Sequence, residues 1–271
     1  MVSTDHPRRD VILTFGLSGT PTPIEGGQGG AWLVGESVMK READLQLQEW
    51  TGTMLASIEQ VGFRLPPVRR AVDGRWVVDG WGVTGALPGV SSETGAVPWP
   101  SVVEAGRAFH AATRELERPG WIFEREDWWA RADRAAWGEQ DMDVIAPIAP
   151  VVDALTCNFA PLGTDQLIHA DLTGNLLYEP DSPPGIIDVS PFWRPAEYAD
   201  GIVVADALCW HGASGDLLRE TGVSLAAAAR GLAFRVLTTN AIQGELPDRR
   251  ALERDLKAFR RGLAVLGSEH A

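Results

Sequence analysis

The chain has 271 residues, and 45% of them are hydrophobic, which is enough apolar material for one large domain or two small ones. A formal net charge of −13 disfavours nucleic acid and anionic membranes as partners. The sequence has no apolar run of roughly 18 residues, no apolar leader, and only two cysteines, Cys157 and Cys209, without metal-site or disulfide-framework spacing. We therefore expect a cytoplasmic protein.

Residues 11–41 predict a small β element, in which the secondary structure of the short apolar run at 11–15 stays open. Within it, two glycine pairs at 26–27 and 29–30 lie between apolar runs, and Lys40 ends a further strand. Such glycines allow a hairpin to approach a ligand closely, although most glycine-rich hairpins are only hairpins. No Gly-Lys-Ser/Thr follows, so the pattern is not a Walker loop.

Residues 42–60 predict a helix, because apolar side chains approximate a stripe along them. Residues 68–71 and 75–81 then predict two strands joined by a turn at Asp73-Gly74. Residues 84–98 have the composition of a loop.

The second half is mainly helical by pattern. Four tryptophans among charged residues at 119–137 either wall a ligand pocket or pack a large amphipathic helix, and packing is the commoner use. His110 is interpreted as a packing or surface residue. Helices are predicted over 101–113, 147–158 and 197–211, and further helices extend to Leu266.

The most informative stretch runs from Gln166 to Trp193. Three short apolar runs, separated by a polar loop and by a turn at 181–185, predict three buried strands. These strands place the polar groups of Asp171, Asn175 and Asp188 at loop edges. Rigid strands that hold carboxylates at a loop edge preorganise a site.

Phosphoryl transfer is the chemistry that these three residues suit. One aspartate accepts the proton of an attacking hydroxyl, while an asparagine and a second aspartate hold the magnesium ions that bridge the nucleotide phosphates. Each residue alone is equally well explained as a turn residue. All three together, each at a strand edge, favour a site.

The segment His169-Ala170-Asp171, with Asn175 and Asp188, resembles the catalytic and metal-binding segment of the aminoglycoside phosphotransferase-like family, which has the protein-kinase-like fold. The resemblance extends from about residue 24 to residue 210, and the fragments IIDVSPFWRP and VVDGWGVTG suggest a branch separate from the known resistance enzymes. The family pattern is HGDxxxxN, whereas here Asn175 follows Asp171 by four residues, so the loop is one residue short. The interval of 13 residues from Asn175 to Asp188 agrees with kinases.

The resemblance implies a role for each matching residue. Asp171 would be the catalytic base, and Asn175 and Asp188 the magnesium ligands. Lys40 would bind the nucleotide phosphates, and Glu49 would pair with Lys40. The alternatives left open are a solvated Lys40, an unpaired Glu49 on a helix surface, and Glu42 or Asp44 as the partner of Lys40.

The resemblance also implies further nucleotide contacts. Gly27 and Gly29 would cover the phosphates, and backbone groups from Trp81 to Val83 would meet adenine at an interlobe hinge. A strand that ends in a glycine-rich bend explains the last segment equally well. His169 would support the catalytic loop, and Asp206 would brace its backbone.

We therefore expect a bilobal α+β protein-kinase-like fold, with an N-terminal nucleotide-binding lobe at 10–83 and a C-terminal catalytic and substrate lobe at 84–271. The expected function is transfer of phosphate from ATP, or GTP, with Mg²⁺, to a hydroxyl of a small molecule, with no nucleic acid or membrane partner. One alternative is a nucleotide-binding pseudokinase. Another is a metal-dependent hydrolase built on His169, Asp171 and Asp188. The sequence predicts neither the acceptor nor the oligomeric state.

Overall fold

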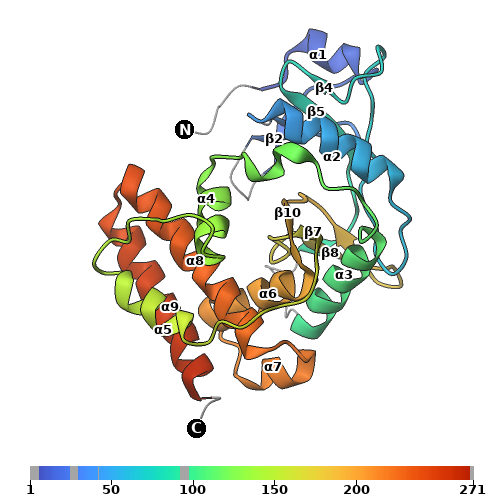
Figure 1. Cartoon of the computed structure of the whole chain (residues 1–271). Coiled ribbons are helices and arrows are strands. Elements are labelled where there is room, and N and C mark those ends of the chain that lie inside the picture. The colour runs from blue at the N-terminus through green and yellow to red at the C-terminus, as the bar shows by residue number, and fades with distance from the viewer. Residues whose placement is uncertain (1–5, 25–29, 42, 92–97, 269–271) are drawn as a thin grey trace. The chain divides into compact units, whose positions relative to one another are not determined.

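The computed structural model describes residues 6–24, 30–41, 43–91 and 98–268 (Figure 1). The chain divides into two compact units, which are described separately. The first comprises residues 1–90 and 177–187, and the second comprises residues 91–176 and 188–271. The expected α+β class is confirmed, since an antiparallel sheet dominates the first unit and helices dominate the second.

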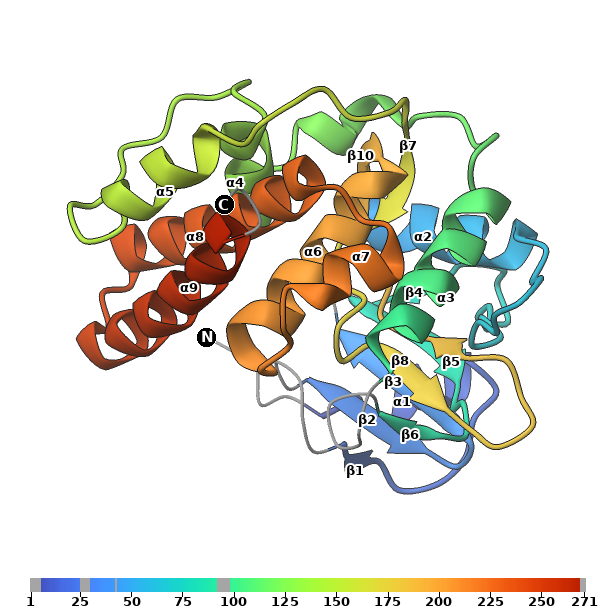
Figure 2. The same ribbon diagram turned by 90° about the horizontal axis from the view of Figure 1, so that it is seen from below.

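The first unit is built on a five-stranded sheet of order β1-β2-β3-β5-β4, in which all neighbours are antiparallel (Figure 2). Its strands are β1 Thr22–Pro23, β2 Ala31–Val34, β3 Ser37–Arg41, β4 Val77–Val78 and β5 Trp81–Gly85. A separate small sheet has the order β6-β8-β9, with β6 Val90–Ser91, β8 Leu176–Tyr178 and β9 Gly185–Ile186.

Two helices accompany the five-stranded sheet. Helix α1, Arg9–Thr14, covers most of the apolar run at 11–15, so the type that the sequence left open there is helical. Val11 and Phe15, four residues apart, are both buried in the same core cluster as β-strand residues, which explains why a helical turn forms there. Helix α2, Leu45–Ser57, confirms the predicted helix. Asp44 caps its N-terminus, because Oδ1 of Asp44 accepts a hydrogen bond from the Leu47 N–H at 2.9 Å.

The predicted strand at 75–81 is wrong in one respect. Asp79 and Gly80 both have positive φ, 52° and 79°, and they form the two-residue turn that joins β4 to β5. An Asp-Gly pair in this conformation is typical of a type I′ hairpin. The turn at Asp73-Gly74 does form, but residues 68–71 contribute only one described bridge, from Val68 to Thr84.

The second unit is a helical body around one antiparallel strand pair, β7 Asp165–His169 and β10 Pro191–Pro195. The helices predicted over 101–113, 147–158 and 197–211 are confirmed, whereas within 119–137 the α-helix covers only 128–136. The helices at 99–112 and 196–210 pack on β7. The α-helices are α3 Trp99–Ala112, α4 Trp128–Ala136, α5 Ala149–Thr156, α6 Ala196–Trp210, α7 Asp216–Thr221, α8 Leu225–Glu245 and α9 Arg249–Ser268, with a 3-10 turn at Gly120–Phe123.

Helix α8 is the packing centre of this unit: it contacts α4, α5, α6 and α9, and Figure 2 shows α8 and α9 side by side. Its closest approach is to α6. A Cβ added at Gly231 would lie 2.5 Å from the carbonyl carbon of Gly201, and one added at Gly201 would collide with the carbonyl of Ala227. The two backbones therefore touch, which fixes how the residues farther along both helices face each other.

Among the described residues, no helix combines the length and the apolar character that a membrane span requires.

Candidate active site

The β7–β10 pair brings the two predicted aspartates to one end of a ladder. Its register pairs His169 with Pro191, and the Ala170 N–H continues the pairing by donating to the Ser190 carbonyl at 3.0 Å. Asp171 lies two residues after one strand, and Asp188 lies three residues before the other. Asp188 is exposed, with a left-handed φ of 54° that is uncommon outside glycine.

His169 ties the two loops together. Its Nδ1 accepts hydrogen bonds from the Asp171 N–H at 3.1 Å and from the Ser190 N–H at 3.4 Å, and the residue is fully buried. The backbone N–H of His169 donates to Nε2 of His110 at 3.1 Å. Because His110 is buried, its pKa is lowered to about 3, and the neutral ring can accept this bond. These contacts make His169 a support for the loop.

Asn175 folds back onto Asp171 although the loop is one residue short. Its Nδ2 donates to the Asp171 carbonyl at 2.7 Å and approaches Oδ2 of Asp171 at 3.3 Å. The turn between them is closed by a bond from the Asn175 N–H to the Leu172 carbonyl at 3.0 Å, with Gly174 at φ 82°. Since Nδ2 makes these bonds, Oδ1 is the atom of Asn175 that can face a metal ion.

Sequence reasoning missed Arg235, which contacts the proposed base. Its Nη2 donates to Oδ1 of Asp171 at 2.7 Å and to Oδ2 of Asp206 at 2.7 Å, while its Nε donates to Oδ1 of Asp206 at 2.8 Å. The expectation that Asp206 braces the loop backbone is therefore corrected, because Asp206 binds Arg235, which holds the Asp171 side chain. The sequence feature that could have indicated Arg235 is its position inside the apolar run GLAFRVL, where a buried arginine needs an acidic partner.

The residues of the first unit that were predicted to bind nucleotide lie in different elements, and two of them are not described. Lys40 lies on β3 opposite Gly82 of β5, and its carbonyl accepts a bond from the Gln48 amide at 3.3 Å. Glu49 accepts hydrogen bonds from the N–H groups of Trp76 and Val77, at 3.4 and 3.0 Å, so it anchors the start of β4. The pairing of Lys40 with Glu49 stays a prediction. Gly27 and Gly29 lie outside the described residues.

Trp81 and Val83 lie in a central strand. Both side chains are buried, β5 pairs with β3 along this segment, and the Val83 carbonyl accepts a hydrogen bond from the Arg69 N–H at 2.9 Å. The sheet therefore uses backbone groups that the hinge interpretation assigned to adenine. Adenine contact at these residues stays a prediction, and it would have to use groups that the strand pairing leaves available.

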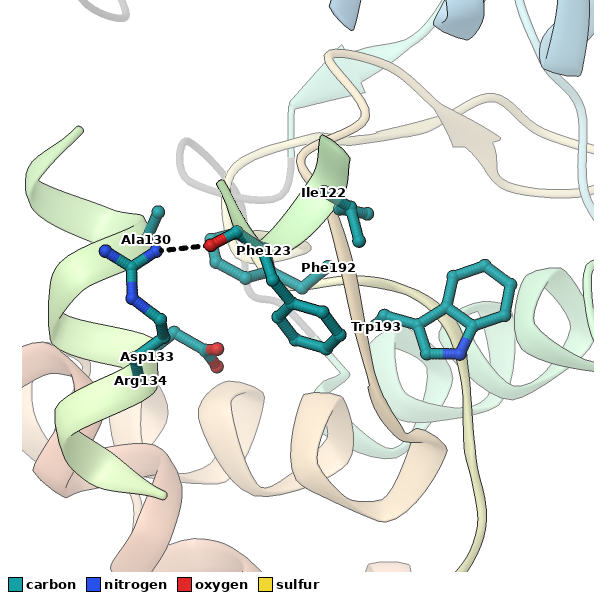
Figure 3. Close-up of a pocket in the computed structure, with 7 residues that line it drawn as sticks. All are labelled: Ile122, Phe123, Ala130, Asp133, Arg134, Phe192 and Trp193. Atoms are coloured by element: carbon teal, nitrogen blue, oxygen red, sulfur yellow. Dashed lines mark hydrogen bonds between the residues drawn. The ribbon is translucent and has the colours of Figure 1, made fainter. Parts of the chain in front are cut away.

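The tryptophans at 119–137 chiefly pack. Trp137 meets Tyr198 edge-on, with ring centroids 5.4 Å apart, and Trp128 donates from Nε1 to Glu245 at 2.7 Å. A cavity of about 10 Å³ lies near Phe123, Asp133 and Phe192 (Figure 3). That volume suits about one water molecule, so this cavity is too small for a nucleotide or an acceptor.

The donor set suits magnesium that arrives with a nucleotide. In the described part of the chain, no three His, Cys, Asp or Glu side chains are grouped to hold a metal ion. Asp188 and Asn175 offer one carboxylate and one amide oxygen. Magnesium in kinase sites takes one or two carboxylates and completes its shell with phosphates and water, so these residues fit a metal–nucleotide complex.

Comparison with solved structures decides the fold. An aminoglycoside phosphotransferase from Alicyclobacillus acidocaldarius superposes with a TM-score of 0.66 at 14% identity, covering 99% of this chain and 98% of the other. This is the fold of the aminoglycoside phosphotransferases. No family model and no curated protein matches the chain at the sequence level.

Two further solved structures share this fold. A spectinomycin phosphotransferase in complex with ADP and spectinomycin has a TM-score of 0.59 at 14% identity, covering 96% of each chain. A choline/ethanolamine kinase family protein from Mesorhizobium loti has a TM-score of 0.52 at 18% identity, covering 93% of each chain. The fold predicted from the sequence is thereby confirmed.

Proposed function

We propose that this protein transfers the terminal phosphoryl group of ATP to a hydroxyl of a small molecule. The observation that carries the proposal is the position of Asp171 and Asp188 at one end of the β7–β10 ladder, with Asn175 folded onto Asp171. A structure of the same fold contains ADP and spectinomycin, which supports a small acceptor.

In the proposed reaction, Asp171 accepts the proton of the acceptor hydroxyl. The acceptor oxygen bonds to the γ-phosphorus as the bond to the ADP oxygen breaks. Asp188 and Asn175 would hold magnesium, which when bound offsets the charge of the phosphates. Lys40 would bind phosphate oxygens. His169 keeps the Asp171 loop against the Ser190 segment through its two accepted hydrogen bonds.

The test is ADP release with Mg·ATP and a panel of acceptors: spectinomycin, hygromycin B, choline and ethanolamine. Asp171→Asn keeps the shape but removes the base, so turnover should fall by at least ~10²-fold while Mg·ATP affinity stays unchanged. Asp181→Asn, in an exposed turn with φ 61°, is the matched control and should keep full turnover.

A pseudokinase is the second candidate, and the short interval from Asp171 to Asn175 is the observation that favours it. It predicts nucleotide binding without phosphorylated product. If ATP turnover were equal in wild type and Asp171→Asn, with every acceptor and with water alone, the proposed enzyme would be rejected.

A further inference from the structure

Arg235 links the loop that carries Asp171 to the interior of the helical unit. It comes from α8, 64 residues beyond Asp171, and reaches Asp171 and Asp206 with three bonds of 2.7–2.8 Å. The loop itself, Leu172-Thr173-Gly174-Asn175, has no cationic side chain. The packing of α8 therefore brings the Arg235 guanidinium into contact with Asp171.

Asp206 holds Arg235 in place. The two make a bidentate pair in which the carboxylate is 5% exposed and the arginine 15% exposed. Burial alone would lower the pKa of Arg235, but Asp206 and Asp171 outweigh it and raise that pKa, so the guanidinium stays charged. The bidentate fork also restricts its orientation, which a single bond would not do.

The contacts distinguish the two oxygens of Asp171. Oδ1 accepts the short charge-assisted bond from Arg235, whereas among the described residues Oδ2 has only the 3.3 Å approach of Asn175. The side chain is 42% exposed. The Arg235 bond therefore fixes the carboxylate plane and leaves Oδ2 as the oxygen that can accept a proton from a hydroxyl.

We propose that Arg235 is a positioning residue for Asp171, held by Asp206, and that it sets which carboxylate oxygen faces the acceptor. This inference rests on the proposed phosphotransfer. A helix-to-helix salt bridge with only a structural role is the competing explanation, and it predicts a loss of stability without a specific loss of turnover.

The experiment must separate these roles, because Arg235→Met alone leaves Asp206 buried without its partner and can unfold the chain. We therefore use the double variant Arg235→Met/Asp206→Leu, which removes both charges together. It should fold, bind Mg·ATP with unchanged affinity and keep the KM for ATP, while kcat falls ~10–100-fold because the carboxylate is no longer fixed.

Arg235→Lys and Arg230→Met are the companion variants. The lysine keeps the charge but loses the fork, so it should restore part of the lost kcat. Arg230 is a second buried arginine of α8 that bonds the Ala136 carbonyl and contacts Trp137, away from Asp171. Its replacement should lower the melting temperature and leave kcat intact.

The deciding comparison repeats the double variant in an Asp171→Asn background. If Arg235 acts through Asp171, the pair of substitutions should produce no further loss of turnover there, since coupled residues are not additive. An equal loss in both backgrounds, or full kcat in the double variant, would overturn the positioning role while leaving the phosphotransfer standing. Wild type without turnover would overturn both.

Discussion

His110 is a buried imidazole whose pKa is lowered by burial from 6.5 to about 3. The folded chain keeps it neutral while the unfolded chain protonates it near pH 6.5. The unfolded state therefore binds more protons between these values, and the stability from His110 is present above pH 6.5 and lost as the pH falls toward 3. The loss approaches about 1.4 kcal/mol per pH unit.

We expect His110→Gln to flatten this dependence. A glutamine oxygen can accept the His169 N–H but does not titrate, so the stability gap to wild type should narrow as the pH falls from 6.5 to 4. Urea denaturation followed by tryptophan fluorescence measures it. If the free energies of unfolding of wild type and His110→Gln changed in parallel from pH 6.5 to 4, the lowered pKa of His110 would be contradicted.

Asp200 is a second buried group, and its effect on the pH dependence of stability is opposite to that of His110. The effect of His110 must therefore be measured as the difference between wild type and His110→Gln. Burial raises the pKa of Asp200 to about 6, against the opposing effect of Arg107. The folded state therefore binds the extra proton between about pH 4 and 6, and this contribution is lost as the pH rises through 6. In wild type the two slopes partly cancel, whereas the comparison with His110→Gln isolates one group.

Residue-scale prediction from the sequence depends on local spacing. Asp171, Asn175 and Asp188 lie within one stretch, so the sequence could place them on consecutive strands and loops. Arg235 could not be found this way, because its contact with Asp171 depends on how α8 packs against α6. The role of His110 was equally hidden, since its partner His169 lies 59 residues farther along.

At the scale of elements, the contact of α6 with α8 depends on two glycines. The backbones touch at Gly201 and Gly231, and the Asp206–Arg235 pair lies four to five residues beyond, about one turn along each helix. Close packing at the glycines therefore sets the distance at which the charged pair meets.

Gly231→Ala should destabilise the helical unit. The added methyl group would lie 2.5 Å from backbone atoms of Gly201 and Ile202, and backbone cannot move aside as a flexible side chain can. Overpacking of this kind costs about 1–3 kcal/mol, which lowers the melting temperature by several degrees. Scanning calorimetry measures the shift.

Gly244→Ala is the control on the same helix. No described atom lies within 4 Å of the added methyl group, and alanine is favoured over glycine in a helix by up to about 1 kcal/mol. Its melting temperature should stay equal or rise. A fall as large as that of Gly231→Ala would show that the cause is not the contact with α6.

Elements were predicted where periodicity was strong and missed where two signals competed. The helices of the second unit have long apolar patterns, and they form as expected. The run VVDGWGV reads equally well as one strand or as a hairpin, and the turn at Asp79-Gly80 decides for the hairpin. Residues 11–15 are too short for periodicity to separate helix from strand.

At the scale of the whole chain, almost all cationic side chains are arginines. Lysine and arginine total 24 residues, yet only Lys40 and Lys257 are lysines. Arginine forms the buried pairs of the second unit, such as Arg194 with Asp133 and Arg235 with Asp206. Lys40 lies on β3, half-buried in the sheet of the first unit, and Lys257 is exposed on α9.

Mg·ATP should stabilise the folded chain. At about 100 times Kd, a ligand adds roughly 2.7 kcal/mol, and a chain of this size gains about 2–4 °C per kcal/mol, so the melting temperature should rise by about 5–10 °C. Differential scanning fluorimetry with and without magnesium measures it. No shift at millimolar Mg·ATP, together with a blank calorimetric titration, would reject nucleotide binding.

Two substitutions separate the contributions of the metal contact and the phosphate contact to the rise in melting temperature with Mg·ATP. Asp188→Ala should remove the part that needs magnesium and keep the response to metal-free ATP, whereas Lys40→Ala should reduce both. Lys257→Ala removes the only other lysine, which is exposed on α9, and should reproduce the wild-type shift. If Lys40→Ala and Lys257→Ala responded alike, Lys40 would not be a residue that binds the phosphates.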